Sequence, residues 1–369
     1  MQIGIDARVI HLPGIGRYIR CLLDGLVRLR TEDRFTLYLS REEHHDLLPE
    51  GMDERFRVRM LPGTYSIKEQ WVVPQAARAD RLDLFHTPHY VVPLFLPCPC
   101  VATLHDLTYY RHPASLRSLP AQSYYRLMHR VGHHRVARVI TVSRTTARDL
   151  QQILGVPARK LQTVYMGVDP RFRTAPPERA AALRERLGCR EFLLYVGTKK
   201  RFKNVPTLLR AFRAIMAEYP GLQLVIAGRG PVEDPEIPRL LAEPALGPRV
   251  RFLEPLPDEE MPVLYSAARA FVLPSFNEGF GSTLAEAMAC GVPCVCADAG
   301  SLPEVAGGAA LLFPPGDDGE LSRQLRRVLD DPALASDLSA RGPRRAAEFD
   351  WWRMAAQTYQ VYLQTKQGG

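Results

Sequence analysis

The sequence lacks the short patterns that would place a metal or redox centre in it. It contains no Cys-x-x-Cys pair, and no histidine stands at ligand spacing beside its seven cysteines. This usage is typical of reduced, buried thiols in a reducing compartment. The alternative is a metal or redox pair at Cys98 and Cys100, or among Cys290, Cys294 and Cys296. An Asp-x-Asp motif that could hold a divalent cation on a phosphorylated substrate is also missing, so we expect no metal site.

Long hydrophobic runs are missing too. The longest apolar stretch, residues 90–104, is interrupted by Pro93, Pro97 and Pro99 and is shorter than the roughly 20 residues that a membrane-spanning helix needs. The first residues, MQIGIDARVI, have no basic leader ahead of an apolar run, so they predict a strand rather than a signal peptide. We therefore expect a cytoplasmic protein.

Acidic residues are missing from one segment. Residues 109–140 contain no Asp or Glu, although the whole chain has 40 acidic against 48 basic residues and a net charge of +8. Such a segment favours a phosphate-bearing substrate or an anionic membrane; the alternative is a solvated helix whose charges pair with acids elsewhere. An apolar stripe beside the arginines fits a helix resting on a membrane or, alternatively, a face packed in the core. The stripe comprises Tyr124, Leu127, Met128 and Val131, and the arginines are Arg111, Arg117, Arg126, Arg130, Arg135 and Arg138.

What is present is an ordinary globular composition. The 369 residues are 46% hydrophobic and 24% charged, and the length favours two domains. Short apolar runs bounded by glycine or proline alternate with longer helical patterns, which predicts parallel α/β architecture. The predicted strands are QIGIDARV, FTLYLS, LDLFH, CVATLHD and RVITVS in the first half, and EFLLYVG, LQLVIAG, VRFLEPL, ARAFVLPS and VPCVCA in the second.

Proline marks the boundary between the two halves. Pro170, Pro176 and Pro177 lie in a stretch without apolar periodicity, which predicts an interdomain connection. A last helix with a large aromatic face is expected to pack back on the first domain. The expected bounds are 1–172 for the first domain, 173–187 for the linker, 188–349 for the second domain and 350–369 for the last helix.

Each half opens with a strand, a glycine-containing turn and a helix. The first turn contains Gly14 and Gly16. Such turns let the backbone approach a phosphate at a helix N-terminus, although a tight turn alone would also explain the glycines. The second turn adds cations, which the helix dipole disfavours at that position. It therefore predicts a bound anion, and a diphosphate neutralised by Lys203 is the natural candidate. The cations are Lys199, Lys200, Arg201 and Lys203.

The stretch NEGFGSTLAEAMACG, residues 277–291, places two glutamates around a glycine-rich loop that enters a helix. N–H groups at the helix start can bind an anion. Glu278 and Glu286, beside a diphosphate, would instead face the hydroxyls of a sugar or ribose. The alternative is that Thr283 and Glu286 form a capping box and that Glu278 is solvated.

These motifs, in this order, resemble glycosyltransferase family four, the retaining enzymes of the GT-B fold. The resemblance covers most of the chain and implies two Rossmann-like domains facing a central cleft. It is closest to a subgroup with many GDP-mannose-dependent mannosyltransferases. The matching pieces are the E-x7-E element at 278–286, GIDARVIHLPGIGRY, HDL at 105–107, ITVSRTTARDL, GVD, VGTKKRFKN, AGRGP and SLPEVAGGAALLFPP.

The resemblance also implies roles for particular residues. His105 would reach the reacting sugar, Lys203 the donor diphosphate and Glu278 the donor sugar, and these are the expected catalytic residues. Glu286 would hold the ribose diol. A core or capping histidine is the alternative for His105. The remaining donor contacts would come from Gly14, Gly16, Arg201, Gly279, Phe280, Gly281, Ser282 and Thr283, without a metal or other cofactor.

Two positions depart from the family pattern. Many members carry arginine at the position of Thr198 or beside the lysine, where this chain has Phe202. Arg201 or Lys199 is therefore expected to make the second phosphate contact. Met166 stands where asparagine usually precedes GVD, and we expect it to affect only the interdomain turn.

The implied function is metal-independent, front-face transfer of a sugar, first of all mannose from GDP-mannose, to a glycan or lipid-linked acceptor hydroxyl. The expected partners are the nucleoside diphosphate sugar, that acceptor and an anionic membrane at its inner face, with no nucleic acid. A UDP-sugar-dependent transferase, a sugar-nucleotide epimerase and a non-catalytic sugar-nucleotide binder are the alternatives. A dinucleotide-dependent oxidoreductase is disfavoured, because no Gly-x-Gly-x-x-Gly is followed by an acidic residue at the required distance.

Overall fold

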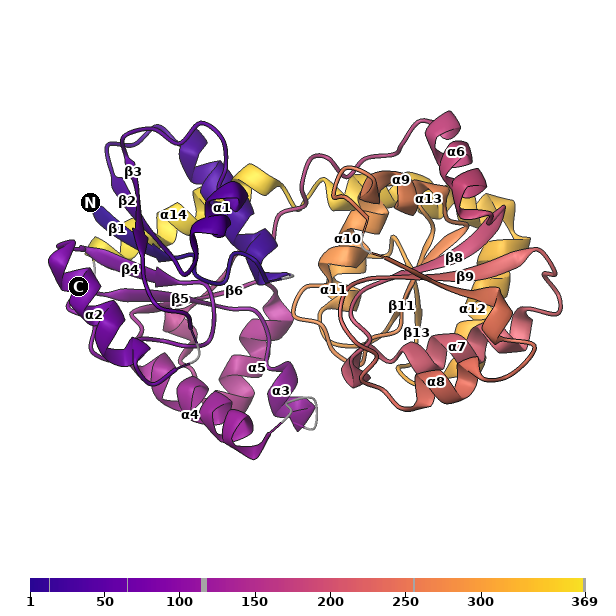
Figure 1. The fold of residues 1–369 in the computed structure, drawn as a ribbon, viewed down its shortest axis with the longest axis horizontal. Helices are drawn as coiled ribbons and strands as arrows, with labels where there is room; N and C mark the ends of the chain where they lie inside the picture. Colours follow the sequence, from indigo (N-terminus) through magenta and orange to yellow (C-terminus); the bar gives the residue numbers. More distant parts are fainter. Residues whose placement is uncertain (13, 65, 114–117, 255, 368–369) are drawn as a thin grey trace. The chain divides into compact units, whose positions relative to one another are not determined.

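The computed structural model describes residues 1–12, 14–64, 66–113, 118–254 and 256–367. Two compact units make up the chain (Figure 1). Unit 1 comprises Met1–Gly167 and Phe349–Gly369, and unit 2 comprises Val168–Glu348. Each unit has its own parallel sheet with helices packed on it, so the chain has the α/β class that the alternating pattern predicts.

The sheet of unit 1 has seven strands in the order β3-β2-β1-β4-β5-β6-β7, all parallel. The inner strand β1 is fully buried at Ile3 and Ile5, as expected where helices cover both faces. Ile3 lies in register with Phe35 on one side and Leu84 on the other. The strands are β1 (Gln2–Asp6), β2 (Arg34–Leu39), β3 (Phe56–Met60), β4 (Leu84–Thr87), β5 (Cys100–Leu104), β6 (Arg138–Thr141) and β7 (Leu161–Thr163).

A helix from the far end of the chain completes unit 1. α14 (Trp351–Gln367) packs along α1 (Ile15–Arg28). A Cβ added to Gly25 would lie 2.2 Å from the Cβ of Ala355, so the two helices approach closely there. Residues 368 and 369 of the expected last helix lie outside the described residues. The other helices described in unit 1 are α2 (Glu69–Ala79), α3 (Thr108–Arg111), α4 (Leu119–Arg135) and α5 (Arg144–Leu154), with short turns η1 (Glu42–Leu47) and η3 (Ala158–Lys160).

The sheet of unit 2 has six parallel strands in the order β10-β9-β8-β11-β12-β13. The strands are β8 (Glu191–Val196), β9 (Leu222–Ala227), β10 (Val250–Leu253), β11 (Ala270–Leu273), β12 (Cys294–Ala297) and β13 (Leu311–Phe313). The helices are α6 (Pro177–Leu187), α7 (Val205–Ile215), α8 (Glu236–Leu241), α9 (Met261–Ala267), α10 (Ser282–Ala289), α11 (Leu302–Ala306), α12 (Asp318–Asp330) and α13 (Pro332–Ala346), with short turns η4 (Arg201–Lys203) and η5 (Gly247–Arg249). Across the described ranges, no helix combines the length and apolarity needed to cross a bilayer.

The segment expected as a linker, 173–187, is mostly helical instead. α6 occupies its second part, belongs to unit 2 and packs on α9. Pro177 stands at the first helical position, where its missing N–H costs nothing, so the prolines mark a helix start. The helix ends at Gly188, in a left-handed conformation with φ +59°. The passage between the units falls earlier, at Gly167 and Val168.

In both sheets the strand order reverses direction once. The chain adds β2 and β3 on one side of β1 and then β4 on its other side, and it treats β9, β10 and β11 around β8 in the same way. The reversal lies between β1 and β4 in unit 1 and between β8 and β11 in unit 2. Ligands of open parallel α/β sheets bind outside the carboxyl ends of the strands at this switch point. In unit 2 the two loops that leave these strand ends carry Lys203 and Glu278.

Candidate active site

The loop after β11 carries Glu278 into α10. Gly281 is the N-cap residue, with φ +86°, a left-handed conformation that favours glycine. Gly300, after β12, packs so tightly that an added Cβ would lie 2.8 Å from both the N and O atoms of Glu278. Ser301 donates to the Glu278 carbonyl from its N–H at 3.2 Å and from Oγ at 3.0 Å. The backbone of Glu278 is therefore held in one position.

Lys203 and Glu278 form an ion pair at the switch point of unit 2. Lys203 Nζ lies 2.7 Å from Glu278 Oε1, and Ser275 Oγ donates to the same oxygen at 2.7 Å. The side chains of Lys203 and Glu278 are 18% and 12% exposed, so solvent and ligands can reach the pair. An anion that reached Lys203 would compete with Glu278 for its N–H donors. The structure thus brings Lys203 and Glu278 into contact. The resemblance assigned Lys203 to the diphosphate of the donor and Glu278 to its sugar.

Asn204 links the two loops that carry this pair. It has φ +55°, a conformation that asparagine tolerates better than most residues. Its Nδ2 donates to Pro274 O at 3.0 Å, and its Oδ1 accepts from Thr207 Oγ1 at 2.8 Å. The end of η4 is thereby tied to the start of the Glu278 loop. The sequence did not point to Asn204, although an asparagine directly before a helix with proline in its first turn was an available signal.

Glu286 is buried in α10, with 3% of its surface exposed. Tyr265 Oη, from α9, donates to Glu286 Oε2 at 3.0 Å. The alternative in which Thr283 and Glu286 form a capping box is wrong, because α10 begins before Thr283 and Gly281 is its N-cap. Glu286 is instead oriented by a buried tyrosine, a contact that sequence spacing could not reveal.

The two cations expected to assist Lys203 have different surroundings. Lys199 is 7% exposed and donates from Nζ to Gly228 O at 2.8 Å, and burial lowers its pKa. Gly228 has no room for a side chain, since an added Cβ would lie 2.2 Å from Gly197 O. Arg201 is exposed and lies two residues before Lys203 in η4. Of the two, Arg201 is therefore placed to contact a ligand.

The glycine turn of unit 1 leads from β1 into α1. Gly14 is the N-cap of α1, has φ +77° and is exposed. Gly16 is buried, and an added Cβ would lie 2.0 Å from Ile10 O. Its N–H donates to Leu12 O at 2.8 Å. The tight-turn explanation therefore accounts for Gly16, whereas Gly14 presents its backbone to solvent.

His105 follows β5 at the carboxyl end of the unit 1 sheet. Its Nε2 lies 3.0 Å from Pro88 O, and its ring meets that of Tyr18 edge-on with centroids 5.0 Å apart. Burial lowers the pKa of His105 to about 4, so the ring is neutral at pH 7. With the proton on Nε2 for the Pro88 carbonyl, Nδ1 is an acceptor and suits a hydroxyl group.

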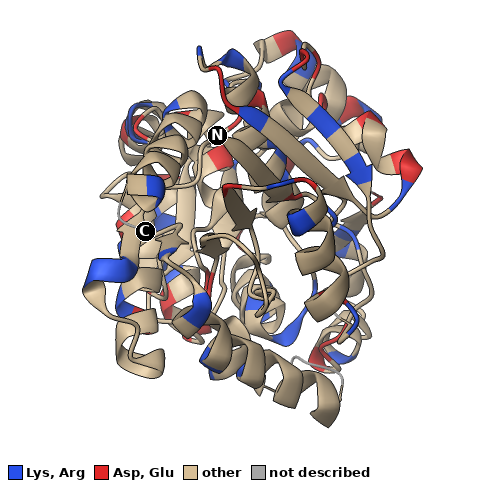
Figure 2. Cartoon of the chain, turned by 90° about the vertical axis from the view of Figure 1, so that its left-hand side faces the viewer, with Lys and Arg blue, Asp and Glu red and all other residues tan. Residues whose placement is uncertain are grey.

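The segment without acids, 109–140, contains α3, α4 and β6; Arg117 lies outside the described residues. Part of its charge is paired, because Arg111 Nη2 donates to Asp149 Oδ1 at 2.6 Å. The two alternatives for the apolar stripe each hold for part of it. Met128 is 3% exposed and packs in the core, whereas Leu127 is 56% exposed. Leu119, outside the stripe, is 76% exposed. Figure 2, in which the left-hand side of Figure 1 faces the viewer, shows basic and acidic residues interspersed.

The cysteines lie mostly inside the two units. Six of the seven are buried, and burial raises the pKa of Cys290 and Cys296 above the ordinary thiol value. They pack as small apolar side chains. Within the described part of the chain, no group of three or more His, Cys, Asp or Glu side chains is arranged to hold a metal ion.

The predicted site residues thus fall into two groups. In unit 1, Gly14, Gly16 and His105 follow the carboxyl ends of β1 and β5. The unit 2 group joins cations, two carboxylates and the N–H donors of a helix start, a set that can bind an anion beside hydroxyl groups. Its members are Arg201, Lys203, Glu278, Gly279, Phe280, Gly281, Ser282, Thr283 and Glu286.

Known proteins share this sequence pattern. Residues 13–172 match the family model described as Glycosyltransferase Family 4, and residues 184–345 match the model described as Glycosyl transferases group 1. The chain is 31% identical to O-antigen chain mannosyltransferase B of Escherichia coli over 288 residues, 76% of this chain and 74% of that protein. It is 32% identical to glycogen synthase of Mycobacterium tuberculosis over 304 residues, 79% of this chain and 71% of that protein. Several further relatives are matched over only 53% to 56% of their own length.

Solved structures share the fold. The Anabaena protein HepE in complex with UDP-glucose matches with a TM-score of 0.78 and 22% identity, over 99% of this chain and 100% of that one. Two parallel sheets in this strand order, each covered by helices, form the GT-B fold. The chain belongs to glycosyltransferase family 4, the group 1 glycosyltransferases.

Proposed function

We propose that this glycosyltransferase moves a sugar from a nucleoside diphosphate sugar to a hydroxyl of a glycan or lipid-linked acceptor, with retention at the anomeric carbon. The observation that carries the proposal is the Lys203–Glu278 pair at the switch point of unit 2, on loops that meet the start of α10. A cation and helix N–H donors suit the diphosphate. A carboxylate beside them suits the hydroxyls of the sugar.

Departure of the diphosphate is the step that these groups assist. As the bond between the anomeric carbon and the diphosphate oxygen breaks, the sugar gains positive charge and the diphosphate gains negative charge. Lys203, Arg201 and the first turn of α10 would stabilise that negative charge as it forms. Glu278, released when the diphosphate takes Lys203, would accept hydrogen bonds from the sugar, and Glu286 from the ribose diol.

The acceptor hydroxyl would attack the same face that the diphosphate leaves, and a departing phosphate oxygen would take its proton. This route needs no nucleophile from the protein. His105, with Nδ1 as acceptor, would orient a sugar hydroxyl. The positive charge of Lys203 and Arg201 would serve in place of a metal ion.

GDP-mannose is the donor that we place first. It is favoured by the likeness to O-antigen chain mannosyltransferase B over most of both chains. UDP-glucose is second, because HepE, a protein of the same fold, binds it. The two donors share the diphosphate that the unit 2 loops would hold and differ in the base and the sugar.

A lipid-linked acceptor suits the surface of α4. Leu119 and Leu127 are exposed there, and Arg126 and Arg130 are exposed on the same helix. This mixture favours peripheral contact with an anionic membrane at its cytoplasmic face. The protein should partition onto anionic vesicles and not onto neutral ones, and Leu127→Ser should weaken this more than Ile153→Ser on α5. Equal partitioning onto both kinds of vesicle would count against membrane contact.

The first test is calorimetric titration with GDP, UDP, ADP and NAD, with and without EDTA. Selective binding of GDP or UDP that survives EDTA supports a metal-independent transferase and names the donor class. Product analysis with labelled GDP-mannose and UDP-glucose then separates transfer from epimerisation and from binding alone. If only NAD binds, or none of the four binds, the proposed function is wrong.

A further inference from the structure

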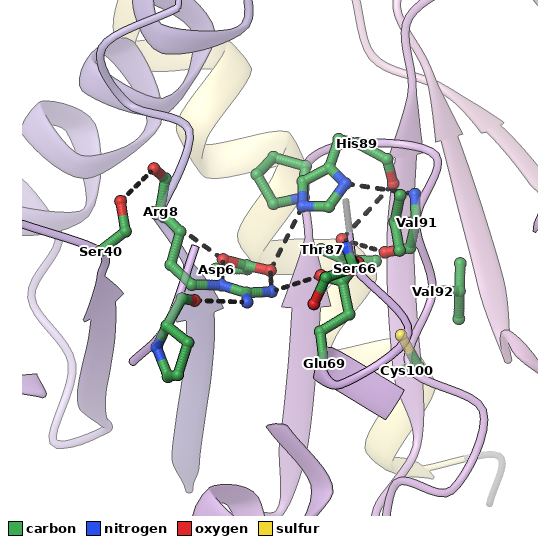
Figure 3. Close-up of polar contacts among 12 residues, drawn as sticks. Asp6, Arg8, Ser40, Ser66, Glu69, Thr87, His89, Val91, Val92 and Cys100 are labelled. Atoms are coloured by element: carbon green, nitrogen blue, oxygen red, sulfur yellow. Dashed lines mark hydrogen bonds and ion pairs between the residues drawn. The ribbon is translucent and has the colours of Figure 1, made fainter. Parts of the chain in front are cut away.

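A buried charged network anchors the loop of unit 1 that carries Gly14 (Figure 3). Asp6 ends β1, and Arg8 follows in the loop. Arg8 donates from Nε and Nη2 to the two Asp6 oxygens at 2.8 and 2.6 Å, and from Nη2 to Glu69 Oε2 at 3.1 Å. His89 Nε2 lies 3.3 Å from Asp6 Oδ2. These four side chains are at most 1% exposed, so they form part of the interior.

The network ties the loop to several strand ends of unit 1. Glu69 lies in the first turn of α2, and His89 lies two residues after β4. Arg8 Nη1 donates to Pro62 O, after β3, at 3.1 Å. Ser40 Oγ, after β2, donates to the Arg8 carbonyl at 3.0 Å. Both the side chain and the backbone of Arg8 are therefore held in place.

The charges in the network stabilise one another. Burial by itself would raise the pKa of Asp6, but the Arg8 guanidinium lowers that pKa well below its usual range. Burial raises the pKa of Glu69, and Arg8 opposes this rise. Glu69 also accepts from Tyr124 Oη at 3.2 Å and lies where the dipole of α2 favours negative charge. Losing the guanidinium fork would leave two buried carboxylates poorly compensated.

The stability of the fold does not by itself explain why these charged groups are buried together. Buried ion pairs hold a fold together no better than apolar side chains of equal volume, because desolvation offsets their attraction, whereas their directional bonds define one geometry. Here the network fills the switch point between β1 and β4, the place where sheets of this kind bind ligands. Arg8 is the one Lys, Arg, Asp or Glu in the described loop residues 7–12 and 14. Its side chain points inward to Asp6 and Glu69 (Figure 3).

We propose that Arg8 is a positioning residue for glycosyl transfer. By holding the loop against Asp6 and Glu69, it fixes the backbone of Gly14 in the geometry that meets the donor phosphates, before the donor arrives. This role rests on the proposed function and adds to it a residue that touches no substrate. Preorganised donors stabilise developing charge because they do not have to move during the reaction. Misplacement by about 1 Å lowers the rate by about 100-fold.

The test compares Arg8→Lys with Arg55→Lys. Lysine at position 8 keeps the charge and loses the fork. Arg55 is a matched control, because it also pairs with an aspartate, Asp53, and donates to the backbone carbonyl of Leu29. It lies at the amino end of β3, away from the switch point. Both variants are followed by hydrogen exchange without ligand and by calorimetric binding of GDP-mannose and UDP-glucose.

In Arg8→Lys, exchange at residues 9–12 and 14–16 should rise by about 10-fold, while β5 and α5 keep their protection. Donor affinity should fall by about 10-fold and the transfer rate by about 100-fold. Arg55→Lys should change neither loop exchange nor donor affinity. Unchanged loop exchange in Arg8→Lys would overturn the role of Arg8, and so would a loss of protection spread evenly over unit 1.

Lys203→Ala separates this role from the proposed function. If Lys203→Ala loses donor binding and Arg8→Lys retains wild-type binding, the positioning role fails and the proposed function stands. If Lys203→Ala also retains wild-type binding, the proposed function fails as well. Should Arg8→Lys not fold, Ser40→Ala decides the outcome by the same two measurements, with about 3-fold effects expected. It removes the bond to the Arg8 carbonyl and the longer contact of Ser40 Oγ with His44 Nδ1 at 3.5 Å.

Discussion

The two units have the same kind of parallel sheet but use their switch points differently. In unit 1 the ends of β1 and β4 are filled by charged side chains that are at most 1% exposed. In unit 2 the ends of β8 and β11 lead to the Lys203–Glu278 pair, whose side chains are 18% and 12% exposed. The strand order determines where a ligand can bind. The side chains at the switch point determine whether it binds a ligand or stabilises a neighbouring loop.

The units also differ in the groups that titrate inside them. All ten histidines lie between His11 and His134, in unit 1, and the sequence of unit 2 contains none. Burial lowers the pKa of His86 and His129 to about 3. The three tryptophans, Trp71, Trp351 and Trp352, also belong to unit 1. Tryptophan fluorescence therefore reports on unit 1 alone.

The largest effect that we expect is from acid, which should lower the stability of unit 1 much more than that of unit 2. The folded pKa values of His86, His105 and His129 lie below the unfolded value of 6.5. The unfolded state therefore binds more protons, and stability falls as the pH drops below 6.5. At pH 5 each histidine costs about 2 kcal/mol, and the three together cost about 6 kcal/mol.

Denaturant titrations at pH 8 and pH 5 measure this effect. The fluorescence midpoint should move to lower denaturant at pH 5, while a part of the far-UV circular dichroism transition, from unit 2, moves much less. Equal shifts of the two signals would show that the units do not differ in this way.

Glu278→Ala sharpens the comparison at the site of unit 2. We expect sugar transfer to fall by about 1000-fold, because the carboxylate that is proposed to meet the sugar is lost. Nucleoside diphosphate affinity should be retained, since Lys203 remains and no longer has a carboxylate partner. Steady-state transfer assays and calorimetry check the two effects, with Glu260→Ala, which breaks a surface pair with Arg186, as the control. Near wild-type turnover in Glu278→Ala would show that Glu278 has no role in sugar transfer.

Lys203→Ala should have a smaller overall effect than the loss of transfer of about 1000-fold in Glu278→Ala, and this effect should be on nucleotide binding. Losing a charge-assisted bond to the diphosphate should weaken GDP or UDP binding by about 30-fold. Arg213→Ala, which removes a cation from an exposed pair with Glu243 in the same unit, should leave binding unchanged. Calorimetric affinities that are equal for the two variants would contradict the role of Lys203.

His129→Phe gives the smallest effect at pH 8 and tests the interior of unit 1. Neither ring nitrogen of His129 has a hydrogen-bond partner in the described structure, and the ring stacks on Tyr90 with centroids 5.2 Å apart. Phenylalanine keeps the stacking and removes the unsatisfied polar atoms, so unit 1 should gain about 1 kcal/mol at pH 8. At pH 5 the gain should be about 2 kcal/mol larger. Fluorescence-monitored denaturation measures both, with exposed His134→Phe as the control; a loss of stability would refute the idea.

Much of the fold could be predicted because local patterns determine it. Apolar runs bounded by glycine or proline predicted ten of the strands. The short edge strands β3, β7 and β13 were missed. The expected linker at 173–187 was wrong. Proline is common both in irregular connections and in the first turn of a helix, and the sequence around Pro176 and Pro177 does not distinguish the two. The packing of α6 on α9 shows that these prolines begin a helix. The core and membrane alternatives for the apolar stripe of α4 stayed open, because periodicity identifies an apolar face without saying what covers it; Met128 is buried and Leu127 is exposed.

The site could be predicted only in part. Lys203, Glu278 and Glu286 stand in recognisable local motifs, and the structure places all three at or beside one switch point. The direct contact between Lys203 and Glu278 joins residues 75 positions apart, which follows from the strand order and not from either motif. The same holds for Tyr265 beside Glu286, and for Glu69, which meets Arg8 across 61 positions.

The packing of α14 on α1 has a consequence for synthesis on the ribosome. Gly25 faces Ala355, so the α1 surface of unit 1 stays uncovered until the chain has been translated through unit 2. Unit 2 is continuous from Val168 to Glu348 and can fold as soon as it emerges. Unit 1 is therefore completed only after unit 2, although residues 1–167 are translated before it, and the face of α1 that meets α14 lacks its packing partner in the meantime.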